Sequence, residues 1–187
     1  MGDKKVLTLL LGSPRAGGNT EALADALAMG AREKGMEIRK TRLAAMNLEG
    51  CRDCRMCWSS NSPCVQKDDM DKVYADIEAA DVVAFVSPLY FYSWSMQIKP
   101  VWDRFLPYGS DKAERSLRGK KVVLLSAAGD DNPACFEGIA FSFRRSSEWL
   151  GWDIAGEVLA YDIYGKGEMT AKGAGYLKQA EELGRRL

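Results

Sequence analysis

The chain has 187 residues, of which 47% are hydrophobic and 28% charged, a composition that supports one compact domain with a substantial core. Its 26 lysines and arginines equal its 26 aspartates and glutamates, so no net charge draws it to nucleic acid or to acidic membranes. Histidine is absent, which excludes Ser-His-Asp and Cys-His catalysis and histidine zinc ligands. The chemistry is therefore expected to be carried by a bound cofactor.

Strand and helix patterns alternate along the chain. Buried strands are expected where apolar residues run together, an edge strand where they alternate with polar ones, and helices where they recur at helical spacing. In chain order the expected elements are a strand at 6–11, a helix at 20–34, an edge strand at 37–43, a helix at 68–79, a strand at 81–86, a helix at 97–105, a strand at 121–127, a helix at 136–150, a strand at 154–160 and a helix at 174–187.

This alternation is typical of an α/β protein whose parallel sheet is covered on both faces through right-handed crossovers. Five strands favour the flavodoxin-like, three-layer, doubly wound fold with strand order 2-1-3-4-5. One domain should span residues 1–187, with a cysteine-rich insertion at about 44–67. Ligands of such sheets bind beyond the carboxyl ends of the strands, so the loops at 12–19, 87–94 and 127–132 should share one crevice.

The chain shows no membrane anchor or export signal. No stretch approaches the ~18 uninterrupted apolar residues of a membrane span. Its first residues run directly into an apolar strand, without the longer hydrophobic region and cleavage site of a signal peptide. These features predict a cytoplasmic protein.

The loop Gly12–Thr20 has the composition of an anion cradle. Its glycines let backbone amides turn inward, Arg15 supplies a fixed positive charge, and the helix N-terminus adds its partial charge. The loop lacks the Gly-Lys-Ser/Thr ending of a Walker loop and is not the G-x-G-x-x-G of a dinucleotide site. A glycine-rich turn capped by Asn19 or Thr20 is the purely structural alternative.

The run Gly-Ser-Pro-Arg followed by Gly-Asn-Thr resembles the FMN phosphate loop of the NADPH-dependent FMN reductase family. This resemblance implies that Ser13, Arg15, Asn19 and Thr20 hold the FMN phosphate, with Gly18 beside them. The resemblance extends from residue 5 to about residue 130.

A second motif, Ser87-Pro-Leu-Tyr-Phe, then Gln97-Ile-Lys and Asp103-Arg104, is similar to the second signature of the same family. It implies flavin contacts at Pro88, Leu89, Tyr90 and Phe91, with Trp94 in the same aromatic stretch. These aromatic rings could instead cap the sheet or fill a dimer interface. The segment Ser126, Ala127, Ala128, Gly129 more weakly resembles a third loop that contacts flavin.

Four cysteines, Cys51, Cys54, Cys57 and Cys64, crowd into the predicted insertion. Compact C-x2-C-x2-C runs commonly hold 4Fe–4S clusters, whereas zinc sites usually separate two cysteine pairs by a longer stretch. The run resembles that of the iron–sulfur flavoproteins, a branch of the same family. It also resembles flavin reductases whose cysteine loop ends in Asp-Asp-Met, some of which hold no cluster, so free thiols near the flavin are an alternative. Cys135 is expected to be a packed thiol.

The resemblance implies an NAD(P)H-dependent oxidoreductase in which a nicotinamide stacks on the flavin and delivers hydride to its N5 atom. The electrons would pass to a small-molecule or protein acceptor, and no side chain is expected to act as a general base. One alternative is an iron–sulfur flavoprotein electron carrier with a 4Fe–4S cluster on the four cysteines. Another is a non-catalytic flavin or zinc module that senses redox state. Exposed aromatic and cysteine loops predict a homodimer or homotetramer.

Overall fold

The structure is a computed structural model that describes residues 4–60, 62–109, 113 and 115–187. Its strands are β1 (Val6–Leu11), β2 (Glu37–Arg42), β3 (Val82–Pro88), β4 (Lys121–Ala127) and β5 (Asp153–Ala160). Its α-helices are α1 (Asn19–Glu33), α2 (Met70–Ala79), α3 (Lys99–Asp103), α4 (Glu137–Leu150), α5 (Glu168–Lys172) and α6 (Ala174–Arg185). Short 3-10 turns are η1 (Leu43–Ala45), η2 (Met56–Trp58), η3 (Leu106–Tyr108) and η4 (Pro133–Phe136).

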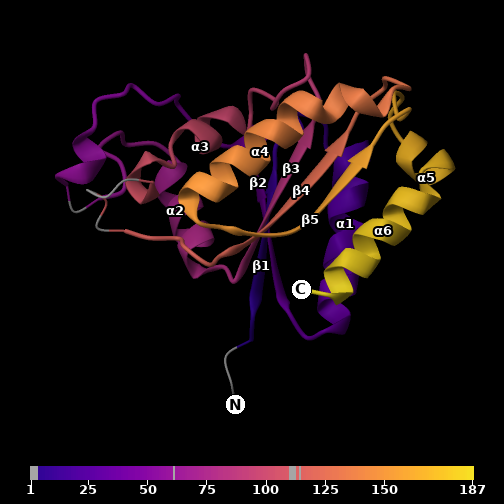
Figure 1. The fold of residues 1–187 in the computed structure, drawn as a ribbon, viewed down its shortest axis with the longest axis horizontal. Helices are drawn as coiled ribbons and strands as arrows, with labels where there is room; N and C mark the ends of the chain where they lie inside the picture. The colour runs from indigo at the N-terminus through magenta and orange to yellow at the C-terminus, as the bar shows by residue number, and fades with distance from the viewer. Residues whose placement is uncertain (1–3, 61, 110–112, 114) are drawn as a thin grey trace.

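The five strands form one parallel sheet in the order β2-β1-β3-β4-β5, which confirms the predicted flavodoxin-like fold. Helices α1, α5 and α6 cover one face of the sheet, and α2, α3 and α4 cover the other (Figure 1). The N-terminal end of the described chain and the C-terminus lie toward the amino ends of the strands, away from α5 (Figure 1). None of the helices in the described ranges is long and apolar enough to cross a membrane.

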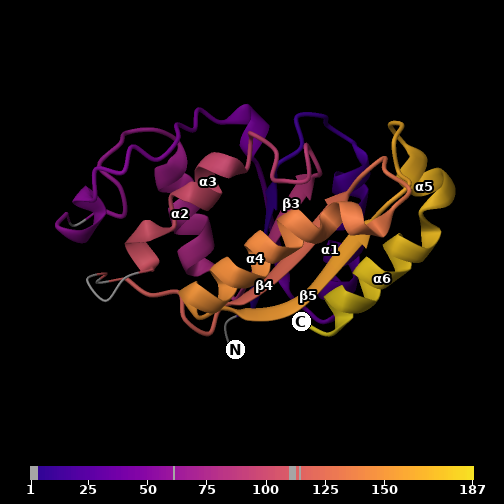
Figure 2. The ribbon, with the colours of Figure 1, turned by 45° about the horizontal axis from the view of Figure 1, so that its top comes forward.

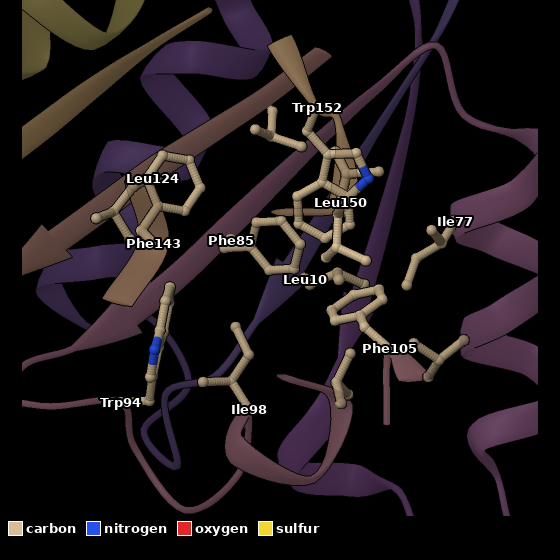
Figure 3. Close-up of a cluster of buried hydrophobic side chains, with 14 of the residues drawn as sticks. Leu10, Ile77, Phe85, Trp94, Ile98, Phe105, Leu124, Phe143, Leu150 and Trp152 are labelled. Atoms are coloured by element: carbon tan, nitrogen blue, oxygen red, sulfur yellow. The ribbon is translucent and has the colours of Figure 1, made fainter. Parts of the chain in front are cut away.

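Alternate residues of the central strands enter two separate cores. In β1, Leu7 and Leu9 are fully buried beneath α1 and α6, whereas Leu10 is fully buried on the other face. Side chains of a strand point alternately to opposite faces, so a strand covered on both sides needs an unbroken apolar run. The second core is rich in aromatic rings around Phe85, as Figure 3 shows. The edge strand β2 is only partly buried, as its alternating pattern predicted.

Helices α2, α3, α4 and α6 are shorter than the sequence predicted, and one helix was missed. Helix α3 begins at Lys99 rather than at 97, with Pro100 in its first turn, where the missing N–H of proline does no harm. Helix α2 begins at Met70, and the two carboxylates before it accept loop amides of the insertion: Asp68 from Glu49 at 2.9 Å and Asp69 from Asn47 at 2.7 Å. The missed helix is α5, a short helix of five residues that follows the fifth strand.

Candidate functional site

A crevice opens at the carboxyl end of the sheet. The three loops predicted to meet there, after β1, β3 and β4, all contribute to it, and so does the loop after β5. Every predicted cofactor contact except Phe91, Trp94 and Ser126 lines this crevice. The lining residues are Ser13, Arg15, Gly18, Asn19, Thr20, Pro88, Leu89, Tyr90, Ala127, Ala128, Gly129, Ile163, Tyr164 and Lys166.

The floor of the crevice is the start of α1. Gly18 is the N-cap residue, and no side chain caps this helix end. The N–H groups of a first helical turn have no partner within the helix, and they carry a partial positive charge. Ser13 is buried and closes the turn before it, because its Oγ accepts the Arg15 amide at 3.1 Å. Thr20 is buried beside this end. The arrangement is suited to an anion.

Asn19 lies in the crevice wall, but its side-chain amide is bonded to the loop after β5 and to the first turn of α5. Its Nδ2 donates to the Gly165 carbonyl at 2.8 Å, and its Oδ1 accepts the Met169 amide at 3.2 Å. The predicted phosphate ligand is thus a clamp between the start of α1 and the segment of Gly165 and α5, about 150 residues away in the chain.

The loop after β5 supplies three wall residues that the sequence reasoning missed: Ile163, Tyr164 and Lys166. Tyr164 is 83% exposed and lies directly over Gly129, where a Cβ atom would come 2.4 Å from the ring. The rule that ligands bind beyond strand ends applies to the fifth strand as to the others, so an aromatic and a basic residue shortly after β5 were the available signal.

The loop after β3 turns back on itself. Tyr90 and Ser93 exchange two backbone hydrogen bonds at 3.1 Å each, and the two residues between them have left-handed backbones, with φ of 46° at Phe91 and 61° at Tyr92. Phe91 is 98% exposed at the tip. It lies beside an adjoining hollow that also contains Cys135, so Phe91 is not a wall of the crevice itself.

Besides Phe91, two other predicted contact residues do not line the crevice. The Trp94 side chain is buried in the aromatic core of Figure 3, where its Nε1 donates to Ser142 Oγ at 3.2 Å and its ring lies 4.4 Å from that of Trp102. The reversal of the chain at Phe91 and Tyr92 directs Trp94 into the core on the face of the sheet covered by α2, α3 and α4. The Ser126 side chain is also buried, because its Oγ donates to the Ser87 carbonyl at 2.8 Å.

The four clustered cysteines line one small pocket. The loop between β2 and α2 that carries them lies on the far side of α2 and α3 from α5 and α6 (Figure 2). Cys51 and Cys54 are exposed, whereas Cys57 and Cys64 are half-buried. Burial raises the pKa of the Cys57 thiol, and negative charge on the other three cysteines raises it further. Within the described residues, no three thiol or carboxyl side chains converge on one metal-ion position. Cys135 is buried elsewhere, as predicted.

The backbone of the cysteine loop is held in an unfavourable conformation. Asp53 and Arg55 both have left-handed backbones, with φ of 48° and 58°. Non-glycine residues in this region cost roughly 1–3 kcal/mol each, and they persist where surrounding structure or function imposes them. The two strained residues flank Cys54 in the chain.

The fold is that of a flavodoxin-like protein, with a crevice at the carboxyl ends of its strands. The model of the NADPH-dependent FMN reductase family matches residues 5–134. The chain therefore belongs to this family of flavin-dependent NAD(P)H reductases.

Individual proteins are similar to this chain in sequence or in fold. An iron–sulfur flavoprotein of Archaeoglobus fulgidus is 29% identical over 178 residues, which cover 95% of this chain and 76% of the relative. A flavone reductase structure superposes with a TM-score of 0.71 at 17% identity, over 97% of this chain and 60% of the other. The NAD(P)H:quinone oxidoreductase from Methanothermobacter marburgensis gives 0.67 at 21% identity, over 98% and 97%. These two structures show a shared fold.

Proposed function

We propose that the protein is an oxidoreductase that binds FMN in the crevice and uses NAD(P)H to reduce an acceptor. The observation that carries the proposal is the uncapped N-terminus of α1, which meets buried Ser13 and Thr20 at the floor of a crevice with largely apolar walls. A phosphate suits the helix end, and a flat amphipathic ring suits walls of proline, leucine and tyrosine.

The charges of the crevice fit a phosphorylated cofactor. Arg15 and Lys166 line it, and no carboxylate is among its described lining residues. Glu21 lies nearby, where its carboxylate accepts the Gly17 amide at 2.6 Å and pairs with Arg42 at 2.6 Å. Burial raises the pKa of Glu21, but the Arg42 hydrogen bond and the Gly17 amide outweigh it and leave the pKa lowered. The salt bridge with Arg42 offsets the repulsion between Glu21 and a bound phosphate.

When bound, FMN would supply the redox chemistry by accepting hydride at its N5 atom and passing reducing equivalents on. The side chains of the crevice would bind and orient it. Arg15 would pair with the phosphate, Leu89 and Tyr164 would contact the ring, and the exposed Phe91 at the mouth would contact the nicotinamide. No histidine is available as a proton shuttle, and hydride transfer needs none.

The test is the visible spectrum of anaerobically purified protein, recorded before and after adding NADPH and then NADH. Rapid bleaching of flavin bands supports the proposal and shows which nucleotide is used. A protein that binds no added FMN refutes it. An Arg15→Gln variant is the control for the site, because it should bind FMN more weakly while riboflavin, which lacks the phosphate, binds as before.

A second function, electron transfer through an iron–sulfur cluster, is favoured by the cysteine pocket. Cys51, Cys54, Cys57 and Cys64 would hold a 4Fe–4S cluster, with one thiolate on each iron. Four thiolates on four irons need not converge on one point, whereas tetrahedral zinc requires that they do. The C-x2-C-x2-C spacing of the first three cysteines in the sequence is the one typical of such clusters. The name of the Archaeoglobus relative points in the same direction.

Iron and acid-labile sulfide contents, together with the spectrum, separate the two functions. One cluster for each chain with slow bleaching by NAD(P)H supports an electron carrier that is reduced by another redox protein. If the protein takes up no iron during anaerobic reconstitution with iron and sulfide, and NAD(P)H still bleaches its flavin bands rapidly, the reductase function alone is supported. Replacing Cys54 by Ser should abolish the cluster and leave FMN binding unchanged, because the pocket and the crevice share no lining residue.

A further inference from the structure

One buried cation lies among the cysteines. Arg104 follows α3, and its side chain is only 1% exposed. One edge of its guanidinium is bonded: Nη1 donates to Asp68 Oδ2 at 2.6 Å and to the Glu49 carbonyl at 3.0 Å. Burial lowers the pKa of Arg104, but the Asp68 hydrogen bond and the charges of Tyr74, Cys64 and Asp68 outweigh it and leave the pKa raised. The side chain is therefore charged.

The other part of the same guanidinium has no partner. Nε and Nη2 of Arg104 are both buried, and neither donates a hydrogen bond in the described structure. Arg104 lines the pocket that also contains all four clustered cysteines. Tyr74 borders this pocket too, but its hydroxyl already donates to the Arg104 carbonyl at 2.8 Å. Buried donors of a charged group are costly when unpaired, so their position calls for an acceptor in the pocket.

The other two arginines of the pocket do not fill this role. Arg52 and Arg55 are exposed, with side-chain exposures of 66% and 64%. Each is paired with a neighbouring carboxylate of its own loop, Glu49 for Arg52 and Asp53 for Arg55. Water screens such exposed charges. Of the three arginines that line the pocket, Arg104 is therefore the one whose charge is buried and poorly screened by water.

We propose that Arg104 is the positioning and tuning residue of the cysteine pocket, donating from Nε and Nη2 to the sulfur atoms of the iron–sulfur cluster held there. The inference rests on the second proposed function, since thiolate and sulfide sulfur are the acceptors that it requires. Four thiolates give the cluster site negative charge, and a one-electron reduction adds another negative charge without moving a proton. Hydrogen bonds and positive charge at the sulfurs stabilise the reduced form most and raise the reduction potential.

The ion pair provides matched variants with opposite expected effects. Arg104→Gln removes the positive charge and the fork of donors, so the potential of the cluster should fall. Asp68→Asn removes the negative charge that partly neutralises Arg104, so the potential should rise. Both variants break the same buried salt bridge, which makes each the control for structural damage caused by the other. Arg104→Lys retains charge without the fork and should give an intermediate potential.

The experiment is an anaerobic redox titration of the full chain, with mediators and dithionite, followed by the electron paramagnetic resonance signal of the reduced cluster. For Arg104→Gln we expect the reduction equilibrium to become at least about tenfold less favourable, which is ~59 mV for a one-electron couple. Iron content and FMN content are measured on every sample.

Opposite shifts in Arg104→Gln and Asp68→Asn support the proposal. A cluster whose potential is the same in wild type and Arg104→Gln, or potentials that fall equally in both variants, would overturn the role of Arg104 and leave the cluster standing. A wild-type protein that takes up no iron on reconstitution refutes the cluster, and this role of Arg104 with it.

Discussion

A substitution of Asn19 tests whether its side chain binds the phosphate directly or supports the crevice wall. Its two side-chain hydrogen bonds, at 2.8 Å to Gly165 in the loop after β5 and at 3.2 Å to Met169 in α5, hold both segments against the start of α1. Each such bond contributes about 0.5–1.5 kcal/mol net, so Asn19→Ala should lower the free energy of unfolding by about 1–3 kcal/mol. Part of this loss falls on ordering the wall that contains Tyr164 and Lys166.

Because Asn19 acts by ordering the crevice wall, Asn19→Ala should weaken binding whether or not the flavin carries a phosphate. At 1.4 kcal/mol for each factor of ten, Asn19→Ala should weaken FMN and riboflavin by the same factor, at most about a hundredfold. Titration of each ligand by quenching of flavin fluorescence measures both constants, and chemical denaturation of the apoprotein measures stability.

The matched control is Arg15→Gln, which should give the opposite pattern. A hydrogen bond to a charged group contributes about 1.5–3 kcal/mol, so FMN should bind roughly ten- to a hundredfold more weakly while riboflavin is unaffected. If Asn19→Ala weakened FMN alone, with unchanged stability, its side chain would be a phosphate ligand. The clamp would then be refuted.

Three further outcomes are expected. Gly30→Ala would place a Cβ atom 2.0 Å from the Glu181 carbonyl between α1 and α6, so it should cost at least about 1–3 kcal/mol by denaturation, whereas Gly175→Ala, with nothing within 4 Å, should change stability by at most about 1 kcal/mol. Trp94→Phe should lower the melting temperature and leave FMN affinity unchanged, contrary to a flavin contact at this residue. Burial raises the pKa of Asp68, but the Arg104 hydrogen bond outweighs it and lowers the pKa below the ordinary value of 3.8. The stability that the Asp68 carboxylate contributes is therefore present above pH 3.8 and is lost as the pH falls through the depressed pKa. The acid-unfolding curve of Asp68→Asn should lack this loss of stability.

The fold could be predicted because its signals are local. Unbroken apolar runs such as Val6–Leu11 can be satisfied only by strands covered on both faces. The ends of elements were harder to predict, because they depend on partners far along the chain. Asp68 and Asp69 look like the first turn of a helix, yet they bind amides of the insertion because tertiary folding brings those amides within reach.

The site was predicted in part for the same reason. Loops that directly follow strands reach the same edge of the sheet whatever their sequence, so the residues of the Gly12–Thr20 loop were found together. The prediction for Trp94 failed because two residues with left-handed backbones reverse the chain before it. Neither of them is glycine, the residue that usually indicates such a turn in a sequence. The wall after β5 was missed because its contact with Asn19 joins residues about 150 positions apart.

The sequence by itself determined the strand and helix order, the loop that meets the N-terminus of α1 and the thiols of the insertion, since each follows from local composition and spacing. Only the tertiary structure decided which side chains face the crevice and which face the core. It also decided that Asn19 clamps a distant loop and that Arg104 lies buried among the cysteines with two donors free. These facts depend on burial and on long-range hydrogen bonds, and the packing of the whole chain sets both.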